Sequence, residues 1–220
     1  MNKDISENRK PLKNNKKVIS ILDYGISNLG SINNMLLKIG ARTRIVSKEE
    51  DVLSSEKLII PGVGAFDNGI KALKKLRLIE PIKKIAKKDI PILGICLGMQ
   101  LLGSGSEEGD LEGLSIIPGF TKKFKFNQNK FNFKIPHMGW NFINPDQKHS
   151  LLSNLDNQSR FYFVHSYHFI PKDPINSLAK TNYGYDFTSI IFSRNVFGTQ
   201  FHPEKSHKFG KILLKNFASL

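Results

Sequence analysis

In the first half of the chain, short apolar runs typical of buried strands alternate with segments whose apolar residues recur at helical spacing. The helical segments are Asn28–Ile39, which Gly40 closes, and Phe66–Lys87, which Pro81 could interrupt. Alternation of strands and helices predicts an α/β fold, with a mostly parallel central sheet and helices on both of its faces. The strand-like runs are Val18–Leu22, Arg42–Val46, Lys57–Ile60 and Pro91–Ile95.

After about residue 114 the apolar residues recur at every second position, which is the period of a strand. Four phenylalanines between Phe124 and Phe133 alternate with polar residues around Asn127–Lys130, and this predicts a β-hairpin. The interleaved lysines would allow these rings to stack on nucleic-acid bases. A period of two favours instead phenylalanines on the core face and lysines in water. Further strands are predicted at Phe161–Tyr167, Ser189–Phe192 and Val196–Phe201, before a closing helix at Ser206–Phe217.

The formal net charge of the 220 residues is +14. The lysines responsible are spread along the chain, as is usual for solvated faces, and no nucleic-acid-binding motif accompanies them. We therefore expect no nucleic-acid partner, and a preference for anionic small molecules or an acidic partner face. No apolar run approaches the roughly 18 residues of a membrane span, so no membrane association is expected.

The chain has one cysteine, which excludes an internal disulfide and a cysteine-rich zinc site. We expect no metal and no cofactor. The N-terminus is rich in lysine and asparagine and lacks the apolar core of a signal peptide. The sequence therefore predicts a cytoplasmic protein with a flexible tail at residues 1–17 and one domain at residues 18–220.

The single cysteine, Cys96, lies where a predicted strand meets a helical segment, and Gly94 and Gly98 flank it symmetrically. G-x-C-x-G is the cysteine counterpart of the G-x-S-x-G elbow, in which a sharp turn exposes a nucleophile. The start of the next helix would favour the thiolate and offer backbone N–H groups to an oxyanion. A small, buried structural cysteine is the alternative.

Of the six histidines, only His202 has a carboxylate placed to orient it. Glu204 follows two residues later, and in an extended backbone the two side chains project to the same side. A solvent-facing His–Glu pair in a turn is the alternative. Together with the elbow, the pair predicts a triad in which Cys96 is the nucleophile, His202 is the base and Glu204 orients the base.

A third motif, PGVG at Pro61–Gly64, ends a predicted strand and therefore belongs at the same edge of the sheet. Its two glycines would let backbone N–H groups approach a substrate, and Val63 or Gly64 could supply an oxyanion donor. An ordinary tight turn is the alternative.

Six motifs together resemble the glutaminase subunits of imidazole glycerol phosphate synthases, which are class I, or triad, glutamine amidotransferases. CLGMQ and FHPE are shared by many triad amidotransferases, whereas PGVGAF, PHMGWN and FVHSY narrow the resemblance to this subunit. The resemblance implies a glutamine amidotransferase domain at residues 18–220, flavodoxin-like, with an antiparallel β extension. The motifs are DYGISNLGS (Asp23–Ser31), IPGVGAF (Ile60–Phe66), GICLGMQLL (Gly94–Leu102), PHMGWN (Pro136–Asn141), FYFVHSY (Phe161–Tyr167) and GTQFHPEKS (Gly198–Ser206).

The resemblance implies hydrolysis of L-glutamine to L-glutamate and ammonia by Cys96, His202 and Glu204. Backbone N–H groups of Val63 and Leu97 would form the oxyanion hole. The residues implied to bind glutamine are Gly62, Gly64, Gly98, Gln100, Glu108, Ser166 and Tyr167. The residues implied at a partner interface are Trp140, Tyr162 and Lys205.

The implied partner is a (βα)8-barrel synthase subunit, which forms a heterodimer with this chain and receives the ammonia. The expected acceptor is the nucleotide from which imidazole glycerol phosphate and AICAR are made in histidine biosynthesis. The alternative is a paralogous subunit that supplies ammonia for amidation of a surface-polysaccharide sugar. One departure from the family pattern, Ser27 in place of glycine, would be strained if that position required a positive φ.

Overall fold

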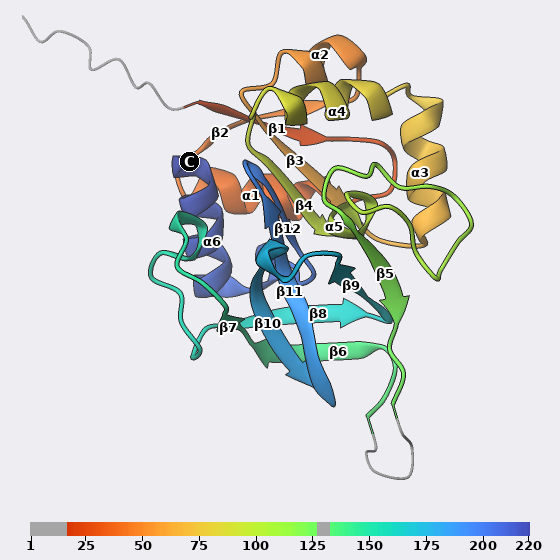
Figure 1. The fold of residues 1–220 in the computed structure, drawn as a ribbon. Coiled ribbons are helices and arrows are strands. Elements are labelled where there is room, and N and C mark those ends of the chain that lie inside the picture. Colours follow the sequence, from red (N-terminus) through yellow and green to blue (C-terminus); the bar gives the residue numbers. More distant parts are fainter. Residues whose placement is uncertain (1–16, 127–132) are drawn as a thin grey trace, which may run out of the picture.

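The computed structural model describes residues 17–126 and 133–220. The parallel part of its sheet consists of β1 (Val18–Leu22), β2 (Arg42–Val46), β3 (Lys57–Gly62), β4 (Ile92–Cys96) and β12 (Val196–Thr199). These strands lie in the order β2-β1-β3-β4-β12, and each neighbouring pair is parallel (Figure 1). This is the strand order of flavodoxin-like folds, so the predicted fold class is confirmed.

Helices cover both faces of the parallel strands. On one face, α1 (Leu29–Lys38) and α6 (His207–Ser219) share a buried apolar core with β1, β3 and β4. On the other face, α2 (Glu49–Leu53), α3 (Phe66–Lys75) and α4 (Ile79–Lys87) share a second core with the same strands. This is possible because alternate residues of a buried strand point to opposite faces.

Beyond β12 the sheet continues with antiparallel strands, which confirms the predicted extension. β11 (Tyr185–Ser193) pairs with β12 and with β10 (Ser177–Tyr183), and β10 pairs with the short β7 (Asn144–Pro145). β9 (Tyr167–Pro171) connects β11 to β5 (Gly119–Lys123).

A separate antiparallel pair, β6 (His137–Phe142) and β8 (Arg160–His165), lies beside this extension (Figure 1). Short 3-10 turns occur at η1 (Ser150–Leu152), η2 (Pro174–Asn176) and η3 (Pro203–Lys205). Of these, η3 bears on the function because it follows β12 at the carboxyl edge of the parallel strands, the edge where open α/β sheets bind ligands.

The predicted helix Phe66–Lys87 is two helices, and the break precedes Pro81 instead of falling at it. Arg77, between α3 and α4, has a φ of 56°, a left-handed conformation through which a right-handed helix does not continue. Pro81 lies in the first turn of α4, where a backbone N–H has no intrahelical partner to lose.

The predicted strand Phe161–Tyr167 is also divided, because β8 and β9 pair in different sheets. The middle of the predicted hairpin, residues 127–132, and residues 1–16 of the predicted tail lie outside the described residues. The described flanks of the hairpin are not strands. Phe124 is nevertheless buried and Lys125 exposed, as a core-facing alternation requires.

Ser27 is not strained, because its φ is not positive; the positive φ in this loop belongs to Gly25, at 87°. In the two described ranges, every helix is too short or too polar to cross a bilayer. The same ranges contain no cluster of three or more His, Cys, Asp and Glu side chains able to hold a metal ion.

Candidate active site

Cys96 lies where β4 ends and α5 (Leu97–Leu101) begins. Its φ of 54° and ψ of −108° are rare for a residue with a side chain. The turn is possible because its neighbours are glycines: a Cβ on Gly98 would overlap the Ile60 carbonyl oxygen, and one on Gly94 would collide with the Gly98 carbonyl. The predicted elbow therefore forms where α5 presses directly against β3 and β4.

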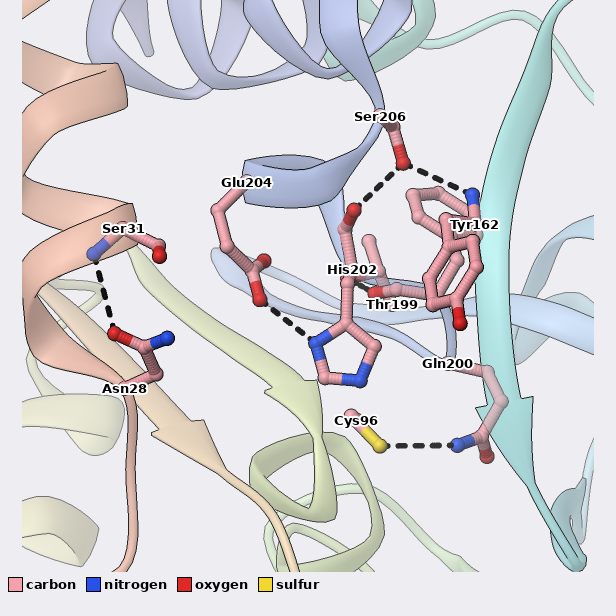
Figure 2. Close-up of polar contacts among 10 residues, drawn as sticks. Asn28, Ser31, Cys96, Tyr162, Thr199, Gln200, His202, Glu204 and Ser206 are labelled. Carbon is pink, nitrogen blue, oxygen red and sulfur yellow. Dashed lines mark hydrogen bonds and ion pairs between the residues drawn. The ribbon is translucent and has the colours of Figure 1, made fainter. Parts of the chain in front are cut away.

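His202 and Glu204 are held in the turn that follows β12. His202 Nδ1 and Glu204 Oε1 lie 2.7 Å apart, and both side chains are almost fully buried (Figure 2). The expectation of an extended backbone between them is wrong, since Pro203–Lys205 forms the 3-10 turn η3. Among the described residues, His202 Nε2 has no hydrogen-bond partner, and it lies on the side of the ring toward the Cys96 sulfur (Figure 2).

The Cys96 sulfur and the Glu204 carboxylate set the protonation of His202. Burial alone lowers the pKa of this imidazole. The contacts with Cys96 and Glu204 together outweigh burial and raise the pKa to about 10. An imidazole that keeps its proton at neutral pH favours the thiolate form of a neighbouring cysteine. The arrangement can supply a nucleophile and, from the same ring, a proton for a leaving group.

A pocket of about 430 Å³ opens beside Cys96. Its wall combines the loop after β3, the elbow and the junction of β8 with β9, which are distant in the sequence. Gly62 and Gly98 do not line it; they lie behind its wall, where a Cβ on Gly62 would meet the Tyr24 hydroxyl. The predicted site residues that line it are Val63, Gly64, Cys96, Leu97, Gln100, Glu108, Ser166, Tyr167 and His202.

Gln100 and Glu108 are both anchored to other parts of the protein. Gln100 Nε2 donates to Gln200 Oε1 at 3.2 Å and to the Tyr167 carbonyl oxygen at 3.4 Å. Glu108 Oε2 accepts a hydrogen bond of 2.9 Å from the backbone N–H of Phe66, at the start of α3. The two side chains therefore reach the pocket wall in fixed orientations, and the amide oxygen of Gln100 and the second carboxylate oxygen of Glu108 can accept from a ligand.

The two predicted oxyanion donors differ in their present bonding. The Leu97 N–H begins α5 directly after Cys96. The Val63 N–H, by contrast, donates to the Ile26 carbonyl oxygen at 3.0 Å. While that bond exists, Val63 has no proton to offer an oxyanion beside Cys96. The following residue, Gly64, has a φ of 110°, which a residue with a side chain rarely adopts.

Two side chains at this edge were not predicted. Gln200 is fully buried, and its Nε2 lies 3.8 Å from the Cys96 sulfur (Figure 2). Ser206 Oγ donates to the His202 carbonyl at 2.6 Å and accepts from the Tyr162 N–H at 3.0 Å, which ties the turn to β8. Gln200 precedes His202 by two residues, a strand-like spacing that could have revealed it; Ser206 has no comparable signal.

One face of the β6–β8 pair exposes large apolar side chains. Met138, Trp140 and Phe142 alternate along β6 and are 62%, 44% and 46% exposed. The Tyr162 ring centre lies 6.2 Å from that of Trp140 and 5.8 Å from Lys205 Nζ. The three residues predicted at a partner interface therefore gather on a single face, where exposed apolar side chains are typical of a docking surface.

A family model described as Glutamine amidotransferase class-I matches residues 20–219. The match agrees with the flavodoxin-like sheet, with the cysteine elbow at the end of β4 and with the buried His–Glu pair beside it. This chain belongs to the class I glutamine amidotransferase family.

Two relatives named imidazole glycerol phosphate synthase subunit HisH 2 make the relationship more specific. The protein from Pseudomonas aeruginosa is 47% identical over 204 residues, which are 92% of this chain and 100% of the relative. The protein from Methanococcus maripaludis is 52% identical over 201 residues, which are 91% of this chain and 98% of the relative.

Solved structures share the fold at much lower identity. A protein from Thermoplasma acidophilum, described as part of a putative GMP synthase, has a TM-score of 0.69 and 20% identity, with 93% of each chain covered. The structure of PurLQS from Thermotoga maritima has a TM-score of 0.65 and 20% identity, covering 93% of this chain and 98% of that one. These likenesses support the fold alone.

Proposed function

We propose that this chain is the glutaminase subunit of an imidazole glycerol phosphate synthase and supplies ammonia for histidine biosynthesis. The observation that carries the chemistry is the buried His202–Glu204 pair beside the only cysteine. The names of relatives 47% and 52% identical over nearly their whole length support this synthase in particular. Ammonia supply to a polysaccharide sugar, the alternative from the sequence, is not favoured by those names.

The first half of the reaction releases ammonia. The Cys96 thiolate attacks the carboxamide carbon of glutamine, so that a C–S bond forms and negative charge moves to the carbonyl oxygen. Backbone N–H groups at Leu97 and Val63 stabilise that charge. His202 gives its Nε2 proton to the nitrogen as the C–N bond breaks, which leaves ammonia and a thioester on Cys96.

The second half regenerates the enzyme. Neutral His202 takes a proton from water, the resulting hydroxide attacks the thioester carbonyl, and the C–S bond breaks. The products are the γ-carboxylic acid of glutamate, which then loses its proton to water, and the original thiolate with protonated His202. Glu204, bonded to Nδ1, keeps the ring oriented and stabilises its charge in both halves.

Selectivity for a free amino acid rests on the acceptors at the pocket wall. A carboxylate at Glu108 and the amide oxygen of Gln100 suit the α-ammonium group of glutamine, which is a donor and carries positive charge. Because Phe66 and Tyr167 hold these side chains through backbone groups, neither has to be ordered when substrate binds.

The face formed by Trp140 of β6 and Tyr162 of β8, with Lys205 of η3 beside it, docks the (βα)8-barrel synthase subunit in a heterodimer. This face lies close to the triad, because the backbone N–H of His202 donates to the backbone carbonyl of Tyr162 at 2.9 Å. Ammonia that enters the barrel without meeting bulk water stays unprotonated and therefore nucleophilic. We assign the reaction to the cytoplasm, which the single unpaired cysteine suits.

The test is glutamate release from glutamine by this chain, alone and with the histidine-pathway synthase subunit of the same organism, with and without the nucleotide substrate. We expect slow release by the isolated chain, because Val63 is bonded away from the site. Release should rise by about 100-fold or more with synthase and nucleotide, the typical value of an oxyanion donor.

Cys96→Ala is the control for the nucleophile. It should abolish glutamate release, to at least about a 1000-fold loss, and leave binding of the synthase subunit unchanged. Comparable release by this variant would contradict the triad. Strong turnover that ignores the synthase and responds instead to a subunit from a polysaccharide gene cluster would contradict the pathway and keep the chemistry.

A further inference from the structure

Gln200 is a buried polar side chain beside Cys96 that the mechanism above does not use. It is fully buried, and its Nε2 lies 3.8 Å from the Cys96 sulfur, within hydrogen-bond range for sulfur (Figure 2). Gln200 and the imidazole of His202 approach the sulfur from different sides (Figure 2).

The hydrogen-bond partners of Gln100 and Gln200 determine which end of the Gln200 amide is nitrogen and which is oxygen. The Tyr167 carbonyl can only accept, so the Gln100 atom 3.4 Å from it must be the amide nitrogen. That nitrogen also lies 3.2 Å from Gln200, which must therefore present its oxygen to Gln100. The other end of the Gln200 amide, the end at the sulfur, is then an N–H donor.

We propose that Gln200 is a further catalytic residue, whose amide N–H stabilises the Cys96 thiolate. An N–H group bonds far more strongly to a thiolate than to a neutral thiol, so a donor held at this position favours the nucleophilic form. The proposal deepens the proposed function, since it takes Cys96 as the nucleophile.

The same chain of bonds joins the nucleophile to the substrate pocket. Gln100 lines that pocket and spends its amide nitrogen on Tyr167 and Gln200. Only its oxygen remains for a ligand, so the group of glutamine that meets Gln100 is a donor. Loss of the Gln200 oxygen would therefore loosen Gln100 and raise the KM for glutamine, while loss of the Gln200 nitrogen acts on the thiolate.

The test is the rate at which iodoacetamide alkylates Cys96 in the full chain between pH 4 and pH 9.5. Because the chain has one cysteine, the mass gain reports this thiol alone. The variants are Gln200→Glu, which replaces the amide NH2 by oxygen and keeps the shape, and Gln200→Met, which removes both polar atoms. The control is Gln147→Met, since Gln147 donates to the Ile175 and Ser177 carbonyls, away from the pocket.

Both Gln200 variants should need a higher pH for half-maximal alkylation, by about one pH unit. At the wild-type midpoint this is about a fivefold loss of rate. At pH 9.5 their rates should reach or exceed that of the unaltered chain, because a less stabilised thiolate is the better nucleophile. Gln147→Met should follow the unaltered profile. Profiles of both Gln200 variants that superimpose on that of the unaltered chain would overturn the proposal.

A second measurement, on the unaltered protein, keeps the test decisive if the variants fold poorly. The side-chain amide proton of Gln200, followed by NMR, should shift with the pH midpoint of alkylation; a signal constant across that range would overturn the proposal. Glutamate release by the unaltered chain with its synthase subunit is scored separately. Its absence would remove the proposed function, whereas the pH shift would still place the Gln200 donor on the sulfur.

Discussion

Two parts of the candidate active site differ in whether their groups already face Cys96. At the ends of β4 and β12, the side chains of Cys96, His202 and Glu204 are buried and already oriented, with 2.7 Å between the imidazole and the carboxylate. At the end of the neighbouring β3, the Val63 N–H is bonded to Ile26 instead of facing the nucleophile. Val63 itself is 46% exposed, in a segment that contains a glycine with positive φ.

The difference indicates how hydrolysis can be restrained until an acceptor is present. A triad held by buried contacts is costly to take apart, so it is a poor place for a switch. Breaking the hydrogen bond between Val63 and Ile26 costs about 1 to 3 kcal/mol, which spans the expected 100-fold stimulation and is within reach of partner binding. We therefore expect Cys96 to react with small electrophiles in the isolated chain. Fast glutamine hydrolysis should require in addition that the loop after β3, which contains Val63 and Gly64, rearranges.

Gly64→Ala is the sharpest way to separate the two parts, because a side chain at a φ of 110° strains the loop in the conformation that bonds Val63 to Ile26. A strain of about 2 kcal/mol should raise the unstimulated rate of glutamate release by up to roughly 30-fold, since it favours the conformation in which the Val63 N–H is free. Alkylation of Cys96 by iodoacetamide should change by less than about twofold, because the triad is not touched.

The matched control is Gly184→Ala, at a φ of 76° in the turn between β10 and β11. It should lower the melting temperature and leave glutamate release unchanged. If Gly64→Ala raised the rate of alkylation as much as that of hydrolysis, or left both unchanged, the two parts would not be separable and the comparison would fail.

Trp140→Ala tests whether the face of β6 and β8 delivers the partner's effect. Truncation of an exposed interface tryptophan costs about 2 kcal/mol, so the half-saturating concentration of synthase subunit should rise roughly 30-fold. The stimulated rate at saturation should be preserved. Ile45→Ala removes an apolar side chain that is similarly exposed, at 53%, on β2 and should have no effect. An unchanged half-saturation for Trp140→Ala would place the interface elsewhere.

The buried histidines of β6, β8 and β9 predict a pH dependence of stability opposite to that of His202. Burial lowers the pKa of His137 and of His168 to about 4, and that of His165 well below its usual value. Because the unfolded chain takes up these protons first, stability should fall as pH decreases from about 6.5 to 5, and His137 and His168 together contribute about 2 kcal/mol of this fall after screening. The raised pKa of His202 acts the other way: its contribution is complete below about 6.5 and is lost as pH rises toward about 10.

Urea unfolding at several pH values measures this effect, and His137→Gln should flatten the profile between pH 6.5 and 5. That window lies above the range in which ordinary carboxylates titrate, so the histidines can be recognised. A flat profile for the unaltered protein would mean that these rings gain protons as readily in the folded state as in the unfolded one.

Much of the fold was predictable from local pattern. The parallel strands and α1 were found because buried strands are continuous apolar runs and α1 has a helical period with a glycine behind it. β6 and β10 were missed, since polar residues and glycine interrupt their alternation. The break between α3 and α4 was misplaced at Pro81, because the left-handed turn at Arg77 has no glycine or proline to mark it.

The sequence by itself determined which chemical groups are available: one thiol in an elbow, a histidine with a carboxylate two residues later, and a glycine-rich loop at the end of a strand. Only the tertiary structure decided how these groups are used. It brought Gln200 to the sulfur through Gln100 and Tyr167, which are distant in the sequence, and it bonded Val63 to Ile26. The physical reason is that residue types and short spacings are local, whereas hydrogen bonds between strand ends depend on the strand order of the folded sheet.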